Sequence, residues 1–142
     1  MASISFSTRP ALFVLLAVAA GSAGLVVTNP GPADFEEFAA DQLTRLVSDE
    51  VCRGDGLPSV LRMLLPDCDG LVRSQRRSFG QLAWAHSQRR NLGLFSIYRT
   101  QLGGRRLLAD LELPSYRATT VAVAGHFWLL QSEARGPQIS SR

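Results

Sequence analysis

An uncharged hydrophobic run from Ala11 to Val27 constrains this chain more than any other feature of its sequence. As a helix, the run would reach about 26 Å, slightly less than the roughly 30 Å hydrocarbon core of a bilayer. Two interpretations compete: an uncleaved membrane anchor, or a signal peptide cleaved after Ala23 in the stretch AAGSAG. We favour the anchor, because hydrophobic residues continue past the point where cleavage would fall. Residues 11–27 are therefore expected to bind the membrane.

The charges on either side of this run predict its orientation. Arg9 and the terminal amine precede it, whereas Asp34, Glu36 and Glu37 follow it. Positive residues are retained in the cytoplasm, so we expect a single pass with the N-terminus cytoplasmic and the rest of the chain outside. If the segment is cleaved instead, the domain is secreted to the periplasm.

The remaining length is enough for one domain. We divide the chain into a hydrophobic segment (1–28), a single α+β domain (29–132) and a polar, disordered tail (133–142). Apolar residues at a helical period and the breakers between them predict helices first in the domain. The expected helices run from about Pro32 to Val51, from Ser59 to Leu65, and from Asp67 to Arg89.

After Asn91 the sequence becomes rich in aromatic and β-branched residues, which is typical of strands. Short links between three such stretches predict an antiparallel three-stranded meander, covered on one face by the helices. The expected strands are 94–100, 116–123 and 127–130.

Cys52 and Cys68 are the two cysteines of the chain. An even number of cysteines outside the cytoplasm predicts one disulfide, which would stabilise the domain by about 3 kcal/mol. Two free buried thiols are the alternative. We further expect the bond to fix the first helix against the start of the third, with Leu61, Leu64 and Leu65 facing the core.

All fifteen basic residues are arginines, and they are distributed unevenly. The stretch 34–51 is acidic and the chain from Cys52 onward is basic, so the two parts are expected to attract each other within the fold. The alternative to a solvated surface is a face that binds anionic lipid headgroups or an acidic polymer. Three clusters would form that face: Arg73, Arg76 and Arg77; Arg89 and Arg90; and Arg105 and Arg106.

No residue pattern predicts catalysis. His86 and His126 lack ligand spacing to each other and to the cysteines, and no GxSxG elbow is present. We therefore expect no enzyme, no metal and no cofactor, with a small hydrolase as the least favoured alternative. Nucleic acid is not an expected partner either, because the domain is placed outside the cytoplasm and has no RNA-binding aromatic motif.

Several short motifs occur together along the chain. They are TNP directly after the hydrophobic run, Phe35/Phe38-Ala39, Gln42-Leu43, Val51-Cys52, Cys68, Arg90-Asn91, LFSIY with Thr100, and LPSY. In combination they resemble a family of short cyanobacterial membrane-anchored proteins known only as a domain of unknown function. The loop Gly103-Gly104-Arg105-Arg106 departs from the pattern by being longer and more basic.

The resemblance implies one N-terminal anchor, two cysteines that act as a set, and one α+β domain. It also implies a plasma or thylakoid membrane, with the domain in the periplasm or lumen. It supplies no activity and no functional residue. The sequence thus predicts a non-catalytic, membrane-tethered interaction or accessory protein.

Overall fold

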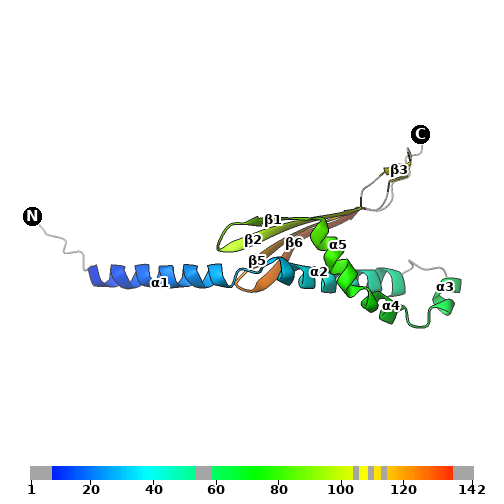
Figure 1. The fold of residues 1–142 in the computed structure, drawn as a ribbon, viewed down its shortest axis with the longest axis horizontal. Coiled ribbons are helices and arrows are strands. Elements are labelled where there is room, and N and C mark those ends of the chain that lie inside the picture. Colours follow the sequence, from blue (N-terminus) through cyan, green and yellow to red (C-terminus); the bar gives the residue numbers. More distant parts are fainter. Residues whose placement is uncertain (1–7, 54–58, 104–105, 109–110, 113–114, 136–142) are drawn as a thin grey trace, which may run out of the picture.

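A computed structural model describes residues 8–53, 59–103, 106–108, 111–112 and 115–135. Helix α1 (Thr8–Val27) projects from the rest of the molecule as a straight rod (Figure 1). Its large hydrophobic side chains are exposed, for example Phe13 at 72%. Among the described residues, α1 alone is long and apolar enough to cross a membrane, as judged by length and composition.

Five further helical segments form the helical part of the domain. The first of them, α2, begins at Pro32, where a proline is favourable because its missing N–H needs no partner. Asp34 accepts a hydrogen bond from the backbone N–H of Gly31 at 2.8 Å, which closes the first turn. The segments are α2 (Pro32–Val47), the π-helix η1 (Ser48–Arg53), α3 (Ser59–Leu64), α4 (Cys68–Ser74) and α5 (Arg76–Ala85).

A four-stranded antiparallel sheet with the order β1-β2-β5-β6 forms the other layer. Helices α2 and α5 lie on one face of this sheet (Figure 1). A second, two-stranded sheet pairs β3 (Arg106–Leu108) with β4 (Leu111–Glu112). The strands of the main sheet are β1 (Ser87–Asn91), β2 (Phe95–Gly103), β5 (Ser115–Val123) and β6 (His126–Arg135).

The core between the layers is aromatic. Phe35 of α2 stacks on Tyr98 of β2 with ring centroids 4.1 Å apart, and both rings lie next to Phe127 of β6. Trp84 of α5 meets the edge of Phe35 at 6.4 Å. Small residues such as Ala83, which is 1% exposed, let the helices approach this cluster.

The two packed helices approach most closely at Gly80. A Cβ atom at this position would lie 2.6 Å from the backbone oxygen of Glu36 and 3.0 Å from the Cβ of Ala40. Any larger residue would therefore push α5 away from α2.

The sequence prediction of an α+β fold with an apolar N-terminal helix is confirmed, but the sheet has four strands rather than three. The predicted third helix, 67–89, is two helices separated at Gln75, and it ends at Ala85. The missed strand β1 pairs with β2, from Ser87 opposite Thr100 to Asn91 opposite Ser96.

The end of the chain also differs from the prediction. The last strand continues to Arg135, where it lies opposite Ser115, so three residues assigned to the disordered tail lie in the sheet. The rest of that tail, 136–142, lies outside the described residues.

Candidate interaction surfaces

Asn29 fixes the end of α1 to the sheet. Its side-chain amide donates to Asn91 Oδ1 and to the carbonyl of Gly93, both at 3.0 Å. Its own Oδ1 accepts from the hydroxyl of Ser96, also at 3.0 Å, and Ser96 is fully buried. We call the segment Thr28–Pro30 the junction.

The two neighbours of Asn29 add backbone contacts to the junction. The carbonyl of Thr28 accepts from the N–H of Gly125 at 2.7 Å. The carbonyl of Pro30 accepts from the hydroxyl of Tyr98 at 3.1 Å and from Nη2 of Arg89 at 3.3 Å. Burial raises the pKa of Tyr98, so its hydroxyl keeps the proton that it donates. The helix is thus joined to the domain without a flexible linker.

Both hairpin turns of the sheet lie beside this junction. Phe95 pairs with Val123, and Val123 pairs with His126, so the β1–β2 and β5–β6 turns occupy the same end of the sheet. In the second turn Ala124 and Gly125 both have positive φ, at 50° and 75°, as a two-residue type I′ hairpin requires. We call residues 91–95 and 123–128 the turn end.

The turn end exposes large apolar side chains. Leu92 and Leu94 are 54% and 39% exposed, and Trp128 is 50% exposed. None of its residues is acidic. Such a group of exposed apolar residues typically marks a surface that contacts something else.

The sheet face opposite α2 and α5 becomes more polar with distance from the turn end. The row Ile97–Val121–Trp128 is apolar except at its β1 end, where Arg90 pairs with Ile97, whereas the row Arg99–Thr119–Gln131 is polar or basic. The apolar residues of this face are therefore concentrated toward the end that adjoins α1, and Leu130, the exposed bulge residue of β6, lies beyond them.

A disulfide joins the helices at the other end of the molecule. Cys52 of η1 and Cys68 of α4 are bonded, with their Cα atoms 5.7 Å apart, as the sequence predicted. Asp67 caps α4 by accepting from the N–H of Gly70 at 2.9 Å, and Asp69 accepts from the hydroxyl of Ser48. The bond thus holds the start of α4 against the end of the helix that continues from α2.

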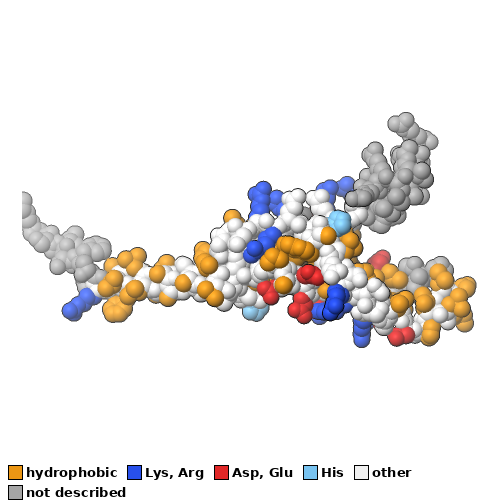
Figure 2. Space-filling view, in the orientation of Figure 1, with side chains coloured by type: hydrophobic (Ala, Val, Ile, Leu, Met, Phe, Trp, Pro, Cys, Tyr) orange, Lys and Arg blue, Asp and Glu red, His pale blue; other side chains and the backbone are white. Residues whose placement is uncertain are grey.

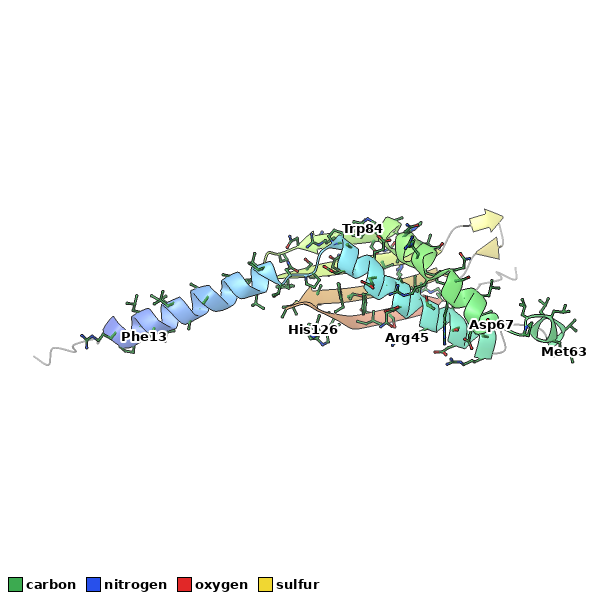
Figure 3. All side chains as sticks on the ribbon, turned by 60° about the horizontal axis from the view of Figure 1, so that its bottom comes forward. Phe13, Arg45, Met63, Asp67, Trp84 and His126 are labelled. Carbon is green, nitrogen blue, oxygen red and sulfur yellow. A yellow bond between two sulfur atoms is a disulfide. The ribbon has the colours of Figure 1, made fainter. Side chains whose placement is uncertain are left out.

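Between the two cysteines lies a strongly exposed apolar segment, residues 59–65, which we call the α3 tip. The exposed fractions are 69% for Val60, 87% for Met63 and 70% for Leu64. The prediction that Leu61, Leu64 and Leu65 face the core is therefore wrong, because the short helix extends away from the sheet. Figure 3 places Met63 at the end of the molecule opposite Phe13 of α1.

The predicted arginine clusters lie in different surroundings. Arg73 and Arg77 are exposed on α4 and α5, and Arg90 is exposed on β1. Arg89 is half-buried, with its guanidinium carbon 5.8 Å from the centre of the Tyr98 ring. Arg106 begins β3, and Arg105 lies outside the described residues. On the face in view, Figure 2 shows basic side chains in separate groups rather than in one patch.

Arg76 is paired with the acidic first helix of the domain. Its Nε lies 2.5 Å from Asp41 Oδ1, and its Nη2 lies 3.5 Å from Glu37 Oε1. The hydrogen bond from Arg76 lowers the pKa of Asp41 and raises that of Arg76 itself. The attraction expected between the acidic and basic parts of the chain therefore occurs here within the fold.

Other parts of the described structure offer little chemistry. Its residues contain no group of three His, Cys, Asp or Glu side chains that could hold a metal ion. A shallow groove lies between α2 and β5, lined mainly by apolar residues such as Phe38 and Leu43. Tyr116 also lines it, and burial raises the pKa of that hydroxyl.

Sequence reasoning missed the junction, because it interpreted Thr28-Asn29-Pro30 only as a helix breaker. A polar Asn directly after an apolar run was the available signal, but its partners are 62 to 67 residues away. The exposure of the α3 tip was also missed, since an apolar segment is normally assigned to the core.

Comparison with known proteins gives one match. The model of the family described as Domain of unknown function (DUF4359) matches residues 23–132, most of the chain. No curated protein and no solved structure matches the chain. The matched region contains the junction, the disulfide and all four strands of the main sheet up to residue 132.

Proposed function

We propose that this chain, which belongs to the Domain of unknown function (DUF4359) family, is a membrane-tethered, non-enzymatic interaction module. In this proposal α1 spans the membrane once and the α3 tip binds a partner protein. The observation that carries the proposal is the pairing of a linker-free junction at one end with an exposed apolar tip at the other.

The junction supports a tether that fixes the height and orientation of the domain in addition to keeping it at the membrane. A flexible linker would let the domain rotate freely, whereas the contacts of Thr28–Pro30 bond the helix end to both hairpin turns. The contacts stabilise the domain whatever its role, but a protein that only needs to remain at a membrane does not require one fixed orientation. A protein that presents a surface at a fixed height and orientation does.

The α3 tip supports a protein partner. Exposed apolar side chains on a monomer are costly unless another molecule covers them, and Val60, Met63 and Leu64 are all largely exposed. Methionine suits such a surface because its flexible thioether adapts to different partners. The disulfide supplies the rigid base that a projecting, otherwise poorly supported helix needs.

The charge distribution supports a domain outside the cytoplasm, because Arg9 precedes α1 and Asp34 follows it. A disulfide is also characteristic of oxidising compartments. In the cyanobacterial setting suggested by the resemblance, the compartment is the periplasm or thylakoid lumen. The non-enzymatic assignment is supported by the two histidines, because the rings of His86 and His126 each bond a backbone carbonyl close by in the sequence, of Leu82 and of Ala124.

The tether is tested by topology. A reporter active only outside the cytoplasm, fused after Arg142, is expected to be active, and the fusion is expected to stay in membranes after carbonate extraction. Activity of a cytoplasmic reporter at the same position would contradict the orientation. Release of the fusion by carbonate would contradict the span.

The partner site is tested by photo-crosslinking in native membranes. A crosslinking amino acid at Met63 is expected to give a discrete adduct, while the same group at Ser78, exposed on α5, gives none. Val60→Glu should abolish the adduct, whereas Leu82→Glu should leave it, since Leu82 is also an exposed apolar residue. Identical adducts from both positions would contradict a site at the tip.

A second candidate function is binding to an anionic surface through arginines, favoured by the exposure of Arg73 and Arg77. Replacing both by Glu should then weaken binding to anionic liposomes in a salt-dependent way. Binding that ignores both salt and the substitutions would count against it.

A further inference from the structure

We propose that the turn end of the sheet is inserted into the lipid interface of the membrane that α1 spans. The chain would then contact this membrane twice, through α1 and through the turn end. Leu92, Leu94 and Trp128 are the side chains that contact lipid. This inference rests on the proposed membrane tether and names a second surface on which the tether depends.

The first argument is that no flexible linker separates α1 from the sheet. Val27 ends α1, and the carbonyl of the next residue, Thr28, is bonded to Gly125 in the β5–β6 turn at 2.7 Å. Asn29 is bonded to Gly93 in the β1–β2 turn at 3.0 Å. The depth of the end of α1 in the membrane therefore determines the depth of both turns.

The second argument is the length of the helix. The uncharged run 11–27 covers about 26 Å, and the hydrocarbon core is about 30 Å thick. A span that is slightly short is accommodated by local thinning of the bilayer, which brings the headgroup zone to the residues that flank the span. The turns therefore begin at or just inside the boundary between hydrocarbon and headgroups.

The third argument is direction. The strands of the main sheet run roughly along the line of α1 in both ribbon views (Figures 1 and 3). A helix that crosses the membrane thus presents the sheet end-on, with the turns nearest the lipid. The α3 tip, at the opposite end of the molecule, then points away from this membrane.

The fourth argument is the chemistry of the exposed side chains along that direction. Leucines are exposed at the turn, and a half-exposed Trp128 lies three residues beyond Gly125, about 10 Å along an extended strand. Tryptophan is favoured at the membrane interface because its ring is apolar with one polar N–H. Arg90, exposed one row from the turn, is placed to reach lipid phosphate.

Polarity farther along the sheet limits the depth. The paired residues Arg99, Thr119 and Gln131 are polar or basic, so this row is expected to stay in the headgroup zone or in water. Apart from Leu130, the exposed bulge residue of β6, the large exposed apolar side chains of this face lie nearer the turn end than that row. Neither a second copy nor a partner protein that covered the whole face would require this gradient.

The test uses the full chain in lipid nanodiscs that contain a lipid with a nitroxide on its headgroup, a short-range quencher of tryptophan fluorescence. Trp84→Phe leaves Trp128 as the single reporter. In a chain that carries both Trp84→Phe and Trp128→Phe, a reporter is placed at Leu94→Trp or at Gln101→Trp. Residues 94 and 101 are about 23 Å apart along the strand direction.

The nitroxide lipid is expected to remove most of the emission at position 94, a smaller share at Trp128, and almost none at position 101. Near-UV circular dichroism checks that each variant is folded. Leu92→Glu with Leu94→Glu should restore the emission of Trp128, while Gln88→Glu, on the exposed side of β1, should not.

Two negative results are distinguishable. If the chain stays with the discs but emission at positions 94 and 101 is quenched equally, the turn end does not lie in the interface, although the tether stands. If the chain separates from the discs on size exclusion, the tether itself fails, and this placement fails with it.

Discussion

Replacing Asn29 by alanine is the most direct test of the rigid junction. The substitution removes three hydrogen bonds, two donated to Asn91 and Gly93 and one accepted from the buried Ser96. Each is worth about 1 kcal/mol, and a buried hydroxyl left unpaired costs at least as much. We therefore expect a loss of about 3 kcal/mol, or roughly 12–24 °C in Tm for a domain of this size.

The assay is thermal unfolding of the full chain in detergent micelles, followed by the tryptophan signal of the domain. Thr28→Ala is the matched control, because the Thr28 hydroxyl bonds within α1 to Gly24 and its backbone bond to Gly125 survives. The control should change Tm little. If Asn29→Ala shifts Tm no more than Thr28→Ala, the junction does not hold the domain and the reasoning is refuted.

Three further predictions concern the helical layer. Gly80→Ala should destabilise by about 1–3 kcal/mol in denaturant unfolding, because its Cβ would overlap the backbone of α2; stabilisation would show that the helices are not in close contact. Cys52→Ser or Cys68→Ser should cost about 2–5 kcal/mol, and reductant should reproduce the loss in the original chain; unchanged Tm would contradict this. The lowered pKa of Asp41 contributes stability that is present above its usual pKa of 3.8 and lost as pH falls through the lowered value; Arg76→Gln should flatten that acid limb in a pH titration of Tm.

Patterns that act over short distances in the sequence could be predicted. The apolar run gave α1, and the period of Phe35, Ala39 and Leu43 gave a helix that packs on the sheet. The stretch LFSIYRT gave a strand because its aromatic and β-branched residues fit a pleated, half-buried surface. The disulfide could be predicted because the chain has two cysteines and they are close together in the sequence.

Features that depend on distant residues could not be predicted in this way. The stretch Ser87–Asn91, with the sequence SQRRN, has no strand-forming residue, and it is a strand only because β2 supplies its hydrogen bonds. The local pattern favoured continuing the helix into this stretch, as far as Arg89. Just after α5 ends at Ala85, the Ser87 hydroxyl donates to the Ala83 carbonyl at 2.6 Å and bonds Thr100 of β2 at 2.7 Å, which holds the start of β1 between the helix and the sheet.

The same distinction explains why function had to be inferred from arrangement rather than from a motif. No single residue of the junction, the turn end or the α3 tip carries chemistry that a sequence pattern would reveal. The proposed function rests on their order along the molecule: an apolar helix, a bonded junction, an apolar turn end, a more polar part of the sheet and an apolar tip. A domain held by one flexible contact would average its orientation over the membrane surface. Because Thr28 and Asn29 bond to two different turns, rotation about α1 carries the whole sheet with it. Under the proposed membrane tether, the tip would then keep one height above the lipid.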